Sequence, residues 1–251
     1  VPCGPETGFK LTPGMLERAI SPKTRVLLLN SPSNPTGAVY SPRELRALGE
    51  VLKRHPDIWI VSDDIYEHLV FDGLEHVSLA TLPGMRERTL VMSSGGKSFN
   101  TTGWKVGWVC APPELIAPVR TAKQFLTYVA GGPFQMGIAA GLRLPDAYYQ
   151  EVAADLQTKR DRICAGLEEA GFLTYKPTGT YFVTVDIRSV RPDGDGFAFC
   201  RALPDLCGVV AIPNVVFYAN KEEGRHMVRF AFCKRHEVID DATARLKALS
   251  R

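Results

Sequence analysis

The chain has 251 residues, of which 45% are hydrophobic, so it can bury a substantial core in one large domain or two modest ones. Its 30 basic and 27 acidic residues are spread along the chain and give a net charge of +3. The densest basic run, Lys234-Arg235-His236, is too short for a nucleic-acid footprint, and no apolar run approaches the ~20 residues that span a bilayer. We therefore expect neither a nucleic-acid partner nor a membrane partner.

The cysteines and histidines indicate neither a disulfide framework nor a metal site. The six cysteines form no CxxC pair, and no His/Cys cluster has the spacing of metal ligands. Cysteines this sparse are typical of a reduced, cytoplasmic protein. The sequence opens with VPCGPETGF, without an initiator methionine or a secretory signal, which suggests the interior of a longer protein.

Apolar strands alternate with helices in the first part of the chain. The run at 25–30 is typical of a strand covered on both faces, and further strands are expected at 57–63, 89–93 and 104–111. The segment 41–55 has the pattern of a helix, with Ser41 as N-cap, Pro42 at the first helical position and Glu44 completing a capping box. This alternation predicts an α/β domain with a largely parallel sheet.

Helices and a second set of strands follow Pro113. The clearest helix spans 147–170, where apolar residues recur at helical spacing and Gly171 follows as a stop. A last helix begins near His236. Further strands are expected at 172–175, 180–187, 209–212 and 226–232. We predict a large domain over residues 1–144 and a smaller α+β domain over residues 145–251.

Polar residues stand where the predicted strands end. Asn34 lies in the turn after the first strand, Asp63 ends the second with Tyr66 three residues on, and Ser94 and Lys97 follow the third. In open α/β sheets, ligands bind beyond the carboxyl ends of the strands. Each signal is weak alone, because NPTG is most often only a turn, an aspartate after a strand is usually an N-cap, and a lone lysine in a glycine-rich loop is usually solvated. Their joint occurrence in this order indicates a site.

The order N-P-T-G, D-x-x-Y, S-x-x-K and T-G-W-K-x-G resembles that of the class I/II aminotransferase family, the fold-type-I enzymes that use pyridoxal 5′-phosphate (PLP). The resemblance covers essentially the whole chain. The motif G-K-S-F…T-G-W-K-V-G-W is similar to that of kynurenine and methionine aminotransferases and cysteine-conjugate β-lyases. The segments 121–135 and 226–235 look most similar to bacterial N-succinyldiaminopimelate aminotransferases.

The resemblance implies cofactor contacts for residues of four motifs: Asn34, Asp63, Tyr66, Ser94, Lys97 and Lys105. In the family pattern Tyr66 and Asn34 hydrogen-bond the ring oxygen of PLP, while Ser94 and Lys105 hold its phosphate. The family usually has arginine at position 105 and often serine at position 96, where this chain has Lys105 and Gly96. A lysine would contact the phosphate as a point charge rather than as a bidentate fork.

The resemblance implies that Lys97 is the catalytic residue and forms the internal Schiff base with PLP. Asp63 would pair with the pyridine nitrogen and keep it protonated, which makes the ring an electron sink. Once displaced by substrate, Lys97 would move a proton between the substrate Cα and the cofactor C4′. The glycines at 95 and 96 would let the backbone bring Lys97 close to a flat ring.

Arg229 lies inside an otherwise apolar run. It could be an edge-strand arginine that reaches solvent, whereas the resemblance implies that it clamps the substrate α-carboxylate together with Asn34, a role that suits a planar bidentate donor. Tyr128 resembles an aromatic residue that reaches the neighbouring subunit's pocket, and ordinary packing is the alternative. The resemblance thus implies a homodimer with shared active sites.

The predicted function is transfer of an amino group from an amino acid to a 2-oxo acid such as 2-oxoglutarate. One alternative is a PLP-dependent C–S β-lyase on the same scaffold, which would release pyruvate and ammonia. Another is the effector domain of an aminotransferase-like transcription regulator, which requires a DNA-binding segment upstream. The donor, whether of the N-succinyl-diaminopimelate, methionine or kynurenine type, is not legible in these residues.

Two further expectations concern the backbone and the extent of the domain. The turn that aims Asn34 at a ring oxygen predicts a cis peptide bond at Asn34-Pro35. The glycine-rich phosphate loop and the ring-stacking aromatic of the family have no counterpart here, so we expect that the N-terminal part of the PLP-binding domain is missing. Residues 1–144 would then be its C-terminal part, and these residues alone would bind PLP poorly.

Overall fold

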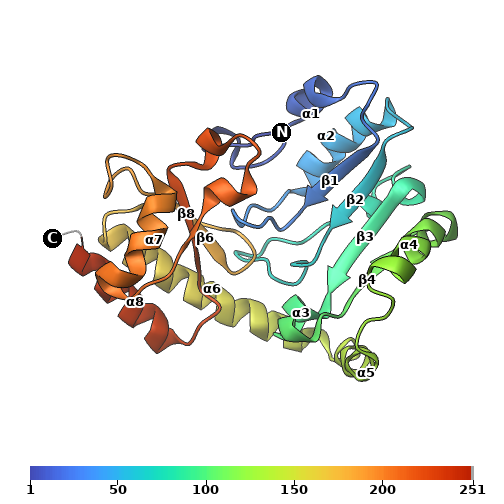
Figure 1. Ribbon diagram of the computed structural model, residues 1–251. Coiled ribbons are helices and arrows are strands. Elements are labelled where there is room, and N and C mark those ends of the chain that lie inside the picture. Colours follow the sequence, from blue (N-terminus) through green and yellow to red (C-terminus); the bar gives the residue numbers. More distant parts are fainter. Residues whose placement is uncertain (250–251) are drawn as a thin grey trace. The chain divides into compact units, whose positions relative to one another are not determined.

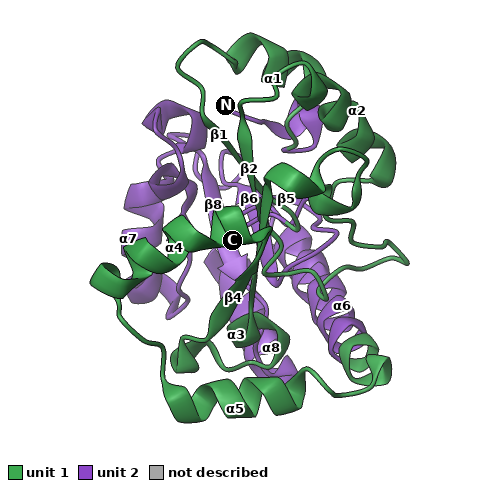
Figure 2. Cartoon of the chain, turned by 90° about the vertical axis from the view of Figure 1, so that its right-hand side faces the viewer, with its two compact units in different colours: residues 1, 10–32, 39–151 green, residues 2–9, 33–38, 152–251 purple. Residues whose placement is uncertain are grey.

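The computed structural model describes residues 1–249, which form two compact units (Figures 1 and 2). Unit 1 comprises residues 1, 10–32 and 39–151, and unit 2 comprises residues 2–9 and 33–38 and the chain from 152 onward. The short segment 33–38 therefore belongs to unit 2, although the residues on both sides of it belong to unit 1. A domain boundary at 144–145 stays a prediction.

The elements of unit 1, in chain order, are α1 (Pro13–Ala19), β1 (Val26–Asn30), α2 (Pro42–Lys53), β2 (Trp59–Asp63), η2 (Leu79–Thr81), η3 (Arg86–Arg88), β3 (Thr89–Ser94), α3 (Gly95–Ser98), η4 (Thr102–Trp104), β4 (Gly107–Cys110), α4 (Pro113–Leu126) and α5 (Gly132–Gly141). Helix α6 (Asp146–Glu169) begins in unit 1 and ends in unit 2. The other elements of unit 2 are η1 (Pro5–Thr7), β5 (Leu173–Tyr175), β6 (Phe182–Asp186), α7 (Gly196–Cys207), β7 (Ile212–Pro213), η5 (Asn214–Phe217), η6 (Lys221–Gly224), β8 (Met227–Ala231) and α8 (His236–Leu249). Within residues 1–249, no helix combines the length and apolarity that crossing a membrane requires.

The sheet of unit 1 has the order β1-β2-β3-β4. The pairs β1/β2 and β2/β3 are parallel, and β3/β4 is antiparallel. Asn30 stands opposite Asp63, and Asp63 opposite Met92, so the carboxyl ends of the three parallel strands share one edge. The predicted largely parallel sheet is confirmed, and the polar residues that follow these strands start from that edge.

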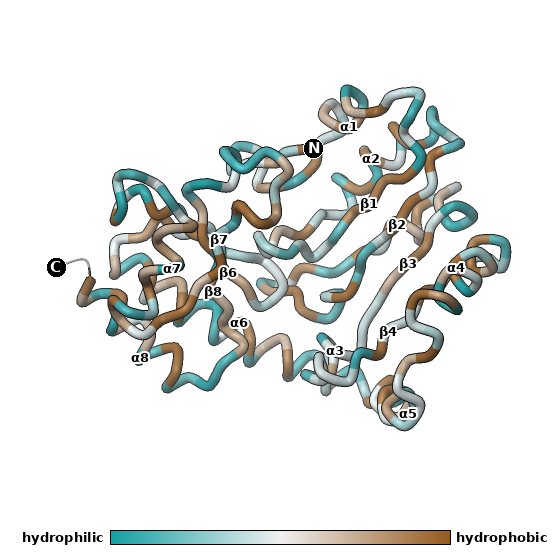
Figure 3. Tube along the Cα trace, in the orientation of Figure 1, coloured by the Kyte–Doolittle hydropathy of each residue, from teal (hydrophilic) through white to brown (hydrophobic). Residues whose placement is uncertain are grey.

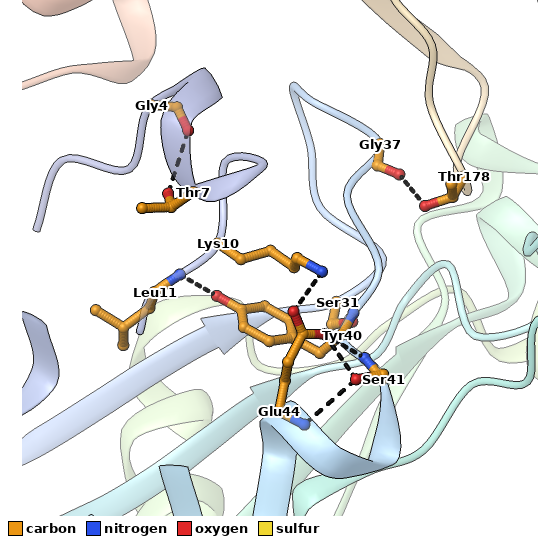
Figure 4. Close-up of polar contacts among 10 residues, drawn as sticks. All are labelled: Gly4, Thr7, Lys10, Leu11, Ser31, Gly37, Tyr40, Ser41, Glu44 and Thr178. Atoms are coloured by element: carbon orange, nitrogen blue, oxygen red, sulfur yellow. Dashed lines mark hydrogen bonds and ion pairs between the residues drawn. The ribbon is translucent and has the colours of Figure 1, made fainter. Parts of the chain in front are cut away.

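The capping box predicted at the start of α2 is confirmed (Figure 4). The Ser41 hydroxyl accepts from the backbone N–H of Glu44 at 3.3 Å, and the Ser41 N–H donates to the Glu44 carboxylate at 2.8 Å. Lys10 pairs with the same carboxylate at 2.6 Å, and the Leu11 N–H donates to the hydroxyl of Tyr40 at 2.7 Å. The first two bonds close the capping box and pair the N–H of Glu44 in the first helical turn, and the other two tie Lys10 and Leu11 to the start of α2.

Strand β1 differs from the expectation of a strand covered on both faces. Its sequence is hydrophobic along most of its length (Figure 3), yet Val26 is 51% and Leu28 61% exposed, while Leu29 is only 6% exposed. Trp59, the register partner of Val26 on β2, is also 44% exposed. Because successive side chains point to opposite faces, the elements within residues 1–249 cover the face of Leu29 and leave the other face of β1 open.

The fourth strand is shorter than the run at 104–111 that predicted it. It begins only at Gly107, because residues Thr102–Trp104 form a 3₁₀ turn and Lys105 has a left-handed backbone with φ 56°. The helix predicted over 147–170 is confirmed as α6, and the predicted stop at Gly171 has φ +87°. The strand expected at 209–212 is the two-residue β7.

Unit 2 contains an antiparallel sheet of order β5-β6-β8-β7. The side chains of Val183, Val185 and Val228 are fully buried and form part of its core with residues of α7 and α8 such as Leu203 and Leu246. Unit 2 therefore has the α+β character that the sequence predicted for the second half of the chain.

Candidate active site

Asp63 ends β2 at the edge where the parallel strands finish. Its Oδ1 atom is buried and has no hydrogen-bond partner among residues 1–249. Burial raises the pKa of this carboxyl group; the backbone N–H of Ile65 opposes the rise, and the charge of Asp64 adds to it. A carboxylate in such a place is stabilised by a cationic or hydrogen-bond-donating group that a ligand brings to it.

The raised pKa of Asp63 predicts a pH-dependent stability. The folded state holds the Asp63 proton more tightly than the unfolded state, whose carboxyl pKa is about 3.9. Stability of the ligand-free protein therefore falls as pH rises from about that value through the folded pKa. Asp63→Asn should then raise the Tm of the ligand-free protein at pH 7 by a few degrees, and the gain should disappear near pH 4.

Thermal unfolding of the ligand-free protein between pH 4 and pH 8 checks this expectation. Asp57→Asn removes the same charge from an exposed position of unit 1 and serves as the matched control. A Tm of Asp63→Asn that equals the wild-type value at every pH, or falls below it at pH 7, would contradict the assignment of an uncompensated carboxylate.

Lys97 lies on a single turn of helix rather than in the loop that the sequence suggested. The turn begins at Ser94, the last residue of β3, whose hydroxyl oxygen accepts from the N–H of Gly96 at 3.2 Å. A Cβ atom at Gly95 would lie 2.4 Å from the side chain of Ile138 on α5, so any larger residue there would have to displace Ile138. Glycine thus brings the Lys97 turn against α5.

Two threonines hold the carbonyl groups of this turn. The hydroxyl of Thr101 donates to the carbonyl of Gly95 at 3.1 Å, and that of Thr102 donates to the carbonyl of Gly96 at 3.0 Å. The backbone N–H of Phe99 also donates to the Gly95 carbonyl at 3.0 Å, so the two hydroxyls add to the single backbone bond of this short helix. The sequence analysis missed this function of Thr101 and Thr102; their only local signal is a pair of hydroxyl residues shortly after the lysine.

The remaining predicted residues of unit 1 lie at the same edge of the sheet. Lys97 Nζ stands 5.9 Å from the centroid of the Tyr66 ring, which is only 2% exposed. Lys105 is exposed and precedes β4, and the register of Ser94 with Gly107 places it at the end of β3 that carries the Lys97 turn. Unit 1 therefore gathers an amine, a buried phenol, a half-buried carboxylate and a second cation beyond the ends of its strands.

Unit 2 brings together the other two predicted residues, Asn34 and Arg229. Arg229 Nη1 donates to Asn34 Oδ1 at 2.5 Å. The guanidinium carbon lies 4.0 Å from the ring centroid of Phe182 and 5.0 Å from that of Phe217. Strand β8 stands between β6 and β7, so the alternative of an edge-strand arginine is wrong. The aromatic rings restrict the plane of the guanidinium group.

The backbone at Asn34 also follows the sequence prediction. The peptide bond Asn34-Pro35 is cis, and so is Ser31-Pro32, which the sequence analysis did not anticipate. The two phenylalanines beside Arg229 were missed as well, because only pairing of β6 with β8 brings Phe182 to the arginine. No local pattern marks either of them.

Comparison with known proteins identifies the class to which this arrangement belongs. Residues 1–246 match the family model described as aminotransferase class I and II. The chain belongs to this family. It is 46% identical to a probable N-succinyldiaminopimelate aminotransferase of Mycobacterium tuberculosis, over 100% of this chain and 65% of that protein. It is 35% identical to a kynurenine–oxoglutarate transaminase of Dictyostelium discoideum, over 97% of this chain and 60% of that protein.

Solved structures agree on the fold. The N-succinyldiaminopimelate aminotransferase from Mycobacterium tuberculosis matches with a TM-score of 0.92 and 47% identity, over 99% of this chain and 64% of that chain. A methionine aminotransferase of Escherichia coli, YbdL, matches with a TM-score of 0.88 and 33% identity, over 96% and 62%. The predicted aminotransferase fold is confirmed. The chain spans just under two thirds of the length of the relatives it matches.

Proposed function

We propose that these residues belong to a PLP-dependent aminotransferase, which moves an amino group from an amino acid to a 2-oxo acid such as 2-oxoglutarate. The observation that carries the proposal is the half-buried Asp63 carboxylate, whose buried Oδ1 atom lacks a hydrogen-bond partner among residues 1–249 and which shares a sheet edge with Lys97 and Tyr66. A protonated pyridine nitrogen is the kind of group that would compensate it.

The donor set of unit 1 fits the chemical groups of PLP. Asp63 would hold the proton of the ring nitrogen, the hydroxyl of Tyr66 would donate to the ring oxygen, and Ser94 and Lys105 would bind the phosphate. The contact of Asn34 with the ring oxygen stays a prediction from the family resemblance. When bound, PLP supplies an aldehyde that takes up an amino group and a ring that accepts the electron pair of the substrate Cα–H bond.

Lys97 is proposed as the catalytic residue. Its amine would hold the cofactor aldehyde in the resting enzyme and, after the substrate amine takes that place, would carry the proton from the substrate Cα. The capped turn from Gly95 to Ser98 restricts where the amine can reach, because both ends of the turn are hydrogen-bonded.

Arg229 and Asn34 are proposed to bind the substrate α-carboxylate. Arg229 gives one N–H to Asn34 and has further N–H groups in its fork, and two aromatic rings hold its plane. An α-carboxylate common to every amino acid and 2-oxo acid would be bound in both half-reactions by the same group. This explains how one site can serve the donor and the acceptor.

We also propose a homodimer in the cytoplasm. The segment around the end of α4 and the start of α5 is strongly exposed and apolar, with Phe125 at 86%, Leu126 at 80%, Tyr128 at 67% and Met136 at 74%. Such a surface is typical of a protein–protein interface. Light scattering on the full-length protein should give the mass of two chains, and a monomer mass at micromolar concentration would contradict the proposal. The cytoplasmic location rests on the sparse cysteines of the sequence.

An amino-donor panel tests the function. The full-length protein is incubated with PLP, 2-oxoglutarate and one donor at a time: N-succinyl-diaminopimelate, kynurenine, methionine or glutamine. Formation of glutamate and of the matching 2-oxo acid supports an aminotransferase. Release of pyruvate and ammonia from a cysteine conjugate, without glutamate, would instead support the β-lyase. No product from any donor or conjugate would overturn the proposed enzyme.

A further inference from the structure

The segment Ser33–Ala38 of unit 2 accepts hydrogen bonds from three other places in the same unit, and Figure 4 shows one of these contacts, at Gly37. Arg229 on β8 donates to Asn34 Oδ1, and the hydroxyl of Thr184 on β6 donates to the carbonyl of Pro35 at 3.2 Å. The carbonyl of Gly37 accepts from the hydroxyl of Thr178 at 3.3 Å (Figure 4) and from the N–H groups of Thr178 at 3.0 Å and of Gly179 at 2.9 Å. The turn that carries Asn34 is thus held along its length.

The packing at Gly37 reinforces this attachment. Gly37 has φ +71°, and a Cβ atom there would lie 2.2 Å from the Cβ of Pro177. Only glycine fits both the left-handed backbone and the close approach to the loop before β6. The turn is therefore held at Gly37, three residues after Asn34.

The Thr184 hydroxyl has a defined direction. Thr184 and Asn214 are both fully buried, and Asn214 Nδ2 donates to Thr184 Oγ1 at 3.4 Å. Because the hydroxyl carries a single hydrogen and accepts from Asn214, that hydrogen goes to the carbonyl of Pro35. Asn214, Thr184 and the carbonyl of Pro35 thus form a chain of two hydrogen bonds.

Strand register places Thr184 directly beside Arg229. The two residues are cross-strand partners of the antiparallel pair β6/β8. Phe182, two residues before Thr184 on the same face of β6, stacks on the guanidinium group. The cross-strand partners Arg229 and Thr184 therefore bind two consecutive residues of the turn. Arg229 donates to the side chain of Asn34, and Thr184 donates to the carbonyl of Pro35.

We propose that Thr184 is a positioning residue for substrate carboxylate binding. Its hydroxyl fixes the Asn34-Pro35 turn, and so keeps Asn34 Oδ1 where it orients the fork of Arg229. The proposal rests on the proposed function of Arg229 and Asn34. It differs from a purely structural role of a buried hydroxyl, which would affect stability without affecting how a carboxylate binds.

The first test uses the full-length enzyme. Thr184→Val keeps the shape and removes the hydroxyl, and should raise KM for the amino donor about tenfold with little change in kcat. Thr184→Ser, which keeps the hydroxyl, should restore KM. If Thr184→Val fails to fold, Thr184→Ala is used instead, and the same rise in KM is expected. Equal KM values for the variants without the hydroxyl and for wild type would overturn the proposal.

Thr243→Val is the matched control. Thr243 is also a buried threonine of unit 2, but its hydroxyl donates only within α8, to the carbonyls of Ile239 at 3.0 Å and Asp240 at 3.1 Å. Its loss should lower Tm and leave KM unchanged. A rise in KM of the same size in Thr243→Val would show that KM follows general destabilisation, and would overturn the role of Thr184.

The second test needs no activity. The Tm loss caused by Thr184→Val is measured in the wild-type background and in the Asn34→Ala background. Substitutions within one hydrogen-bond network do not have additive effects on stability. The Tm loss caused by Thr184→Val should therefore be distinctly smaller when residue 34 is already alanine. Equal losses would overturn the proposal. If the donor panel finds no activity but the losses differ, the proposed function fails while the coupling of Thr184 to the turn stands.

Discussion

Lys97→Ala should abolish transamination by the full-length protein. The proton transfer that Lys97 is proposed to perform is worth about 10²–10⁴-fold in rate, and the variant also loses the amine that holds the cofactor. The cofactor should still bind through its ring and phosphate contacts, without the visible absorbance band of the lysine-bound form. Steady-state rates and absorbance spectra measured with added PLP check both expectations.

Two matched variants separate the possible roles of Lys97. Lys97→Arg keeps the positive charge but cannot lose its proton, so it should be as inactive as the alanine variant. Lys53→Ala removes an exposed lysine of α2 and should leave the rate unchanged. Turnover by Lys97→Ala at the wild-type rate would show that another residue performs the chemistry.

Arg229→Lys should raise KM for amino acids about 10- to 100-fold, because a charge-assisted bidentate contact is worth about 1.5–3 kcal/mol. A lysine cannot reproduce the planar fork, and it would lose the bond to Asn34 and the stack between Phe182 and Phe217. PLP affinity should stay at the wild-type value, since the resemblance gives Arg229 no contact with the cofactor. Initial rates over a donor concentration series and a PLP titration measure the two quantities.

Arg225→Lys provides the control for this experiment. Arg225 lies close in sequence and is exposed, and it pairs with Glu222 at 3.5 Å on the surface of unit 2. Its replacement should change neither KM nor PLP affinity. If KM hardly moves in Arg229→Lys, the stacked arginine has a structural role and another cation binds the carboxylate.

Local chemistry explains which parts of the fold could be predicted. The capping box of Ser41 and Glu44 acts within four residues, so the start of α2 was legible in the sequence. Strand ends followed by polar residues led to Asp63, Tyr66 and Lys97, because parallel strands place their carboxyl ends at one edge. The exposure of Val26 and Leu28 does not follow from the pattern of the strand itself, since an apolar strand does not reveal which of its faces another element covers. It agrees with the expectation that a sheet without its N-terminal strands leaves an apolar edge and face exposed.

By itself, the sequence determined the family, the alternation of strands and helices, and the identity of the proposed site residues. Only the tertiary structure decided how those residues are held. It put segment 33–38 into unit 2 and joined Arg229 to Asn34, residues 195 positions apart. It also placed Thr184 beside them through strand pairing. Capping and turn signals depend on neighbours along the chain, whereas these contacts depend on strand register and packing, which arise only when distant segments meet.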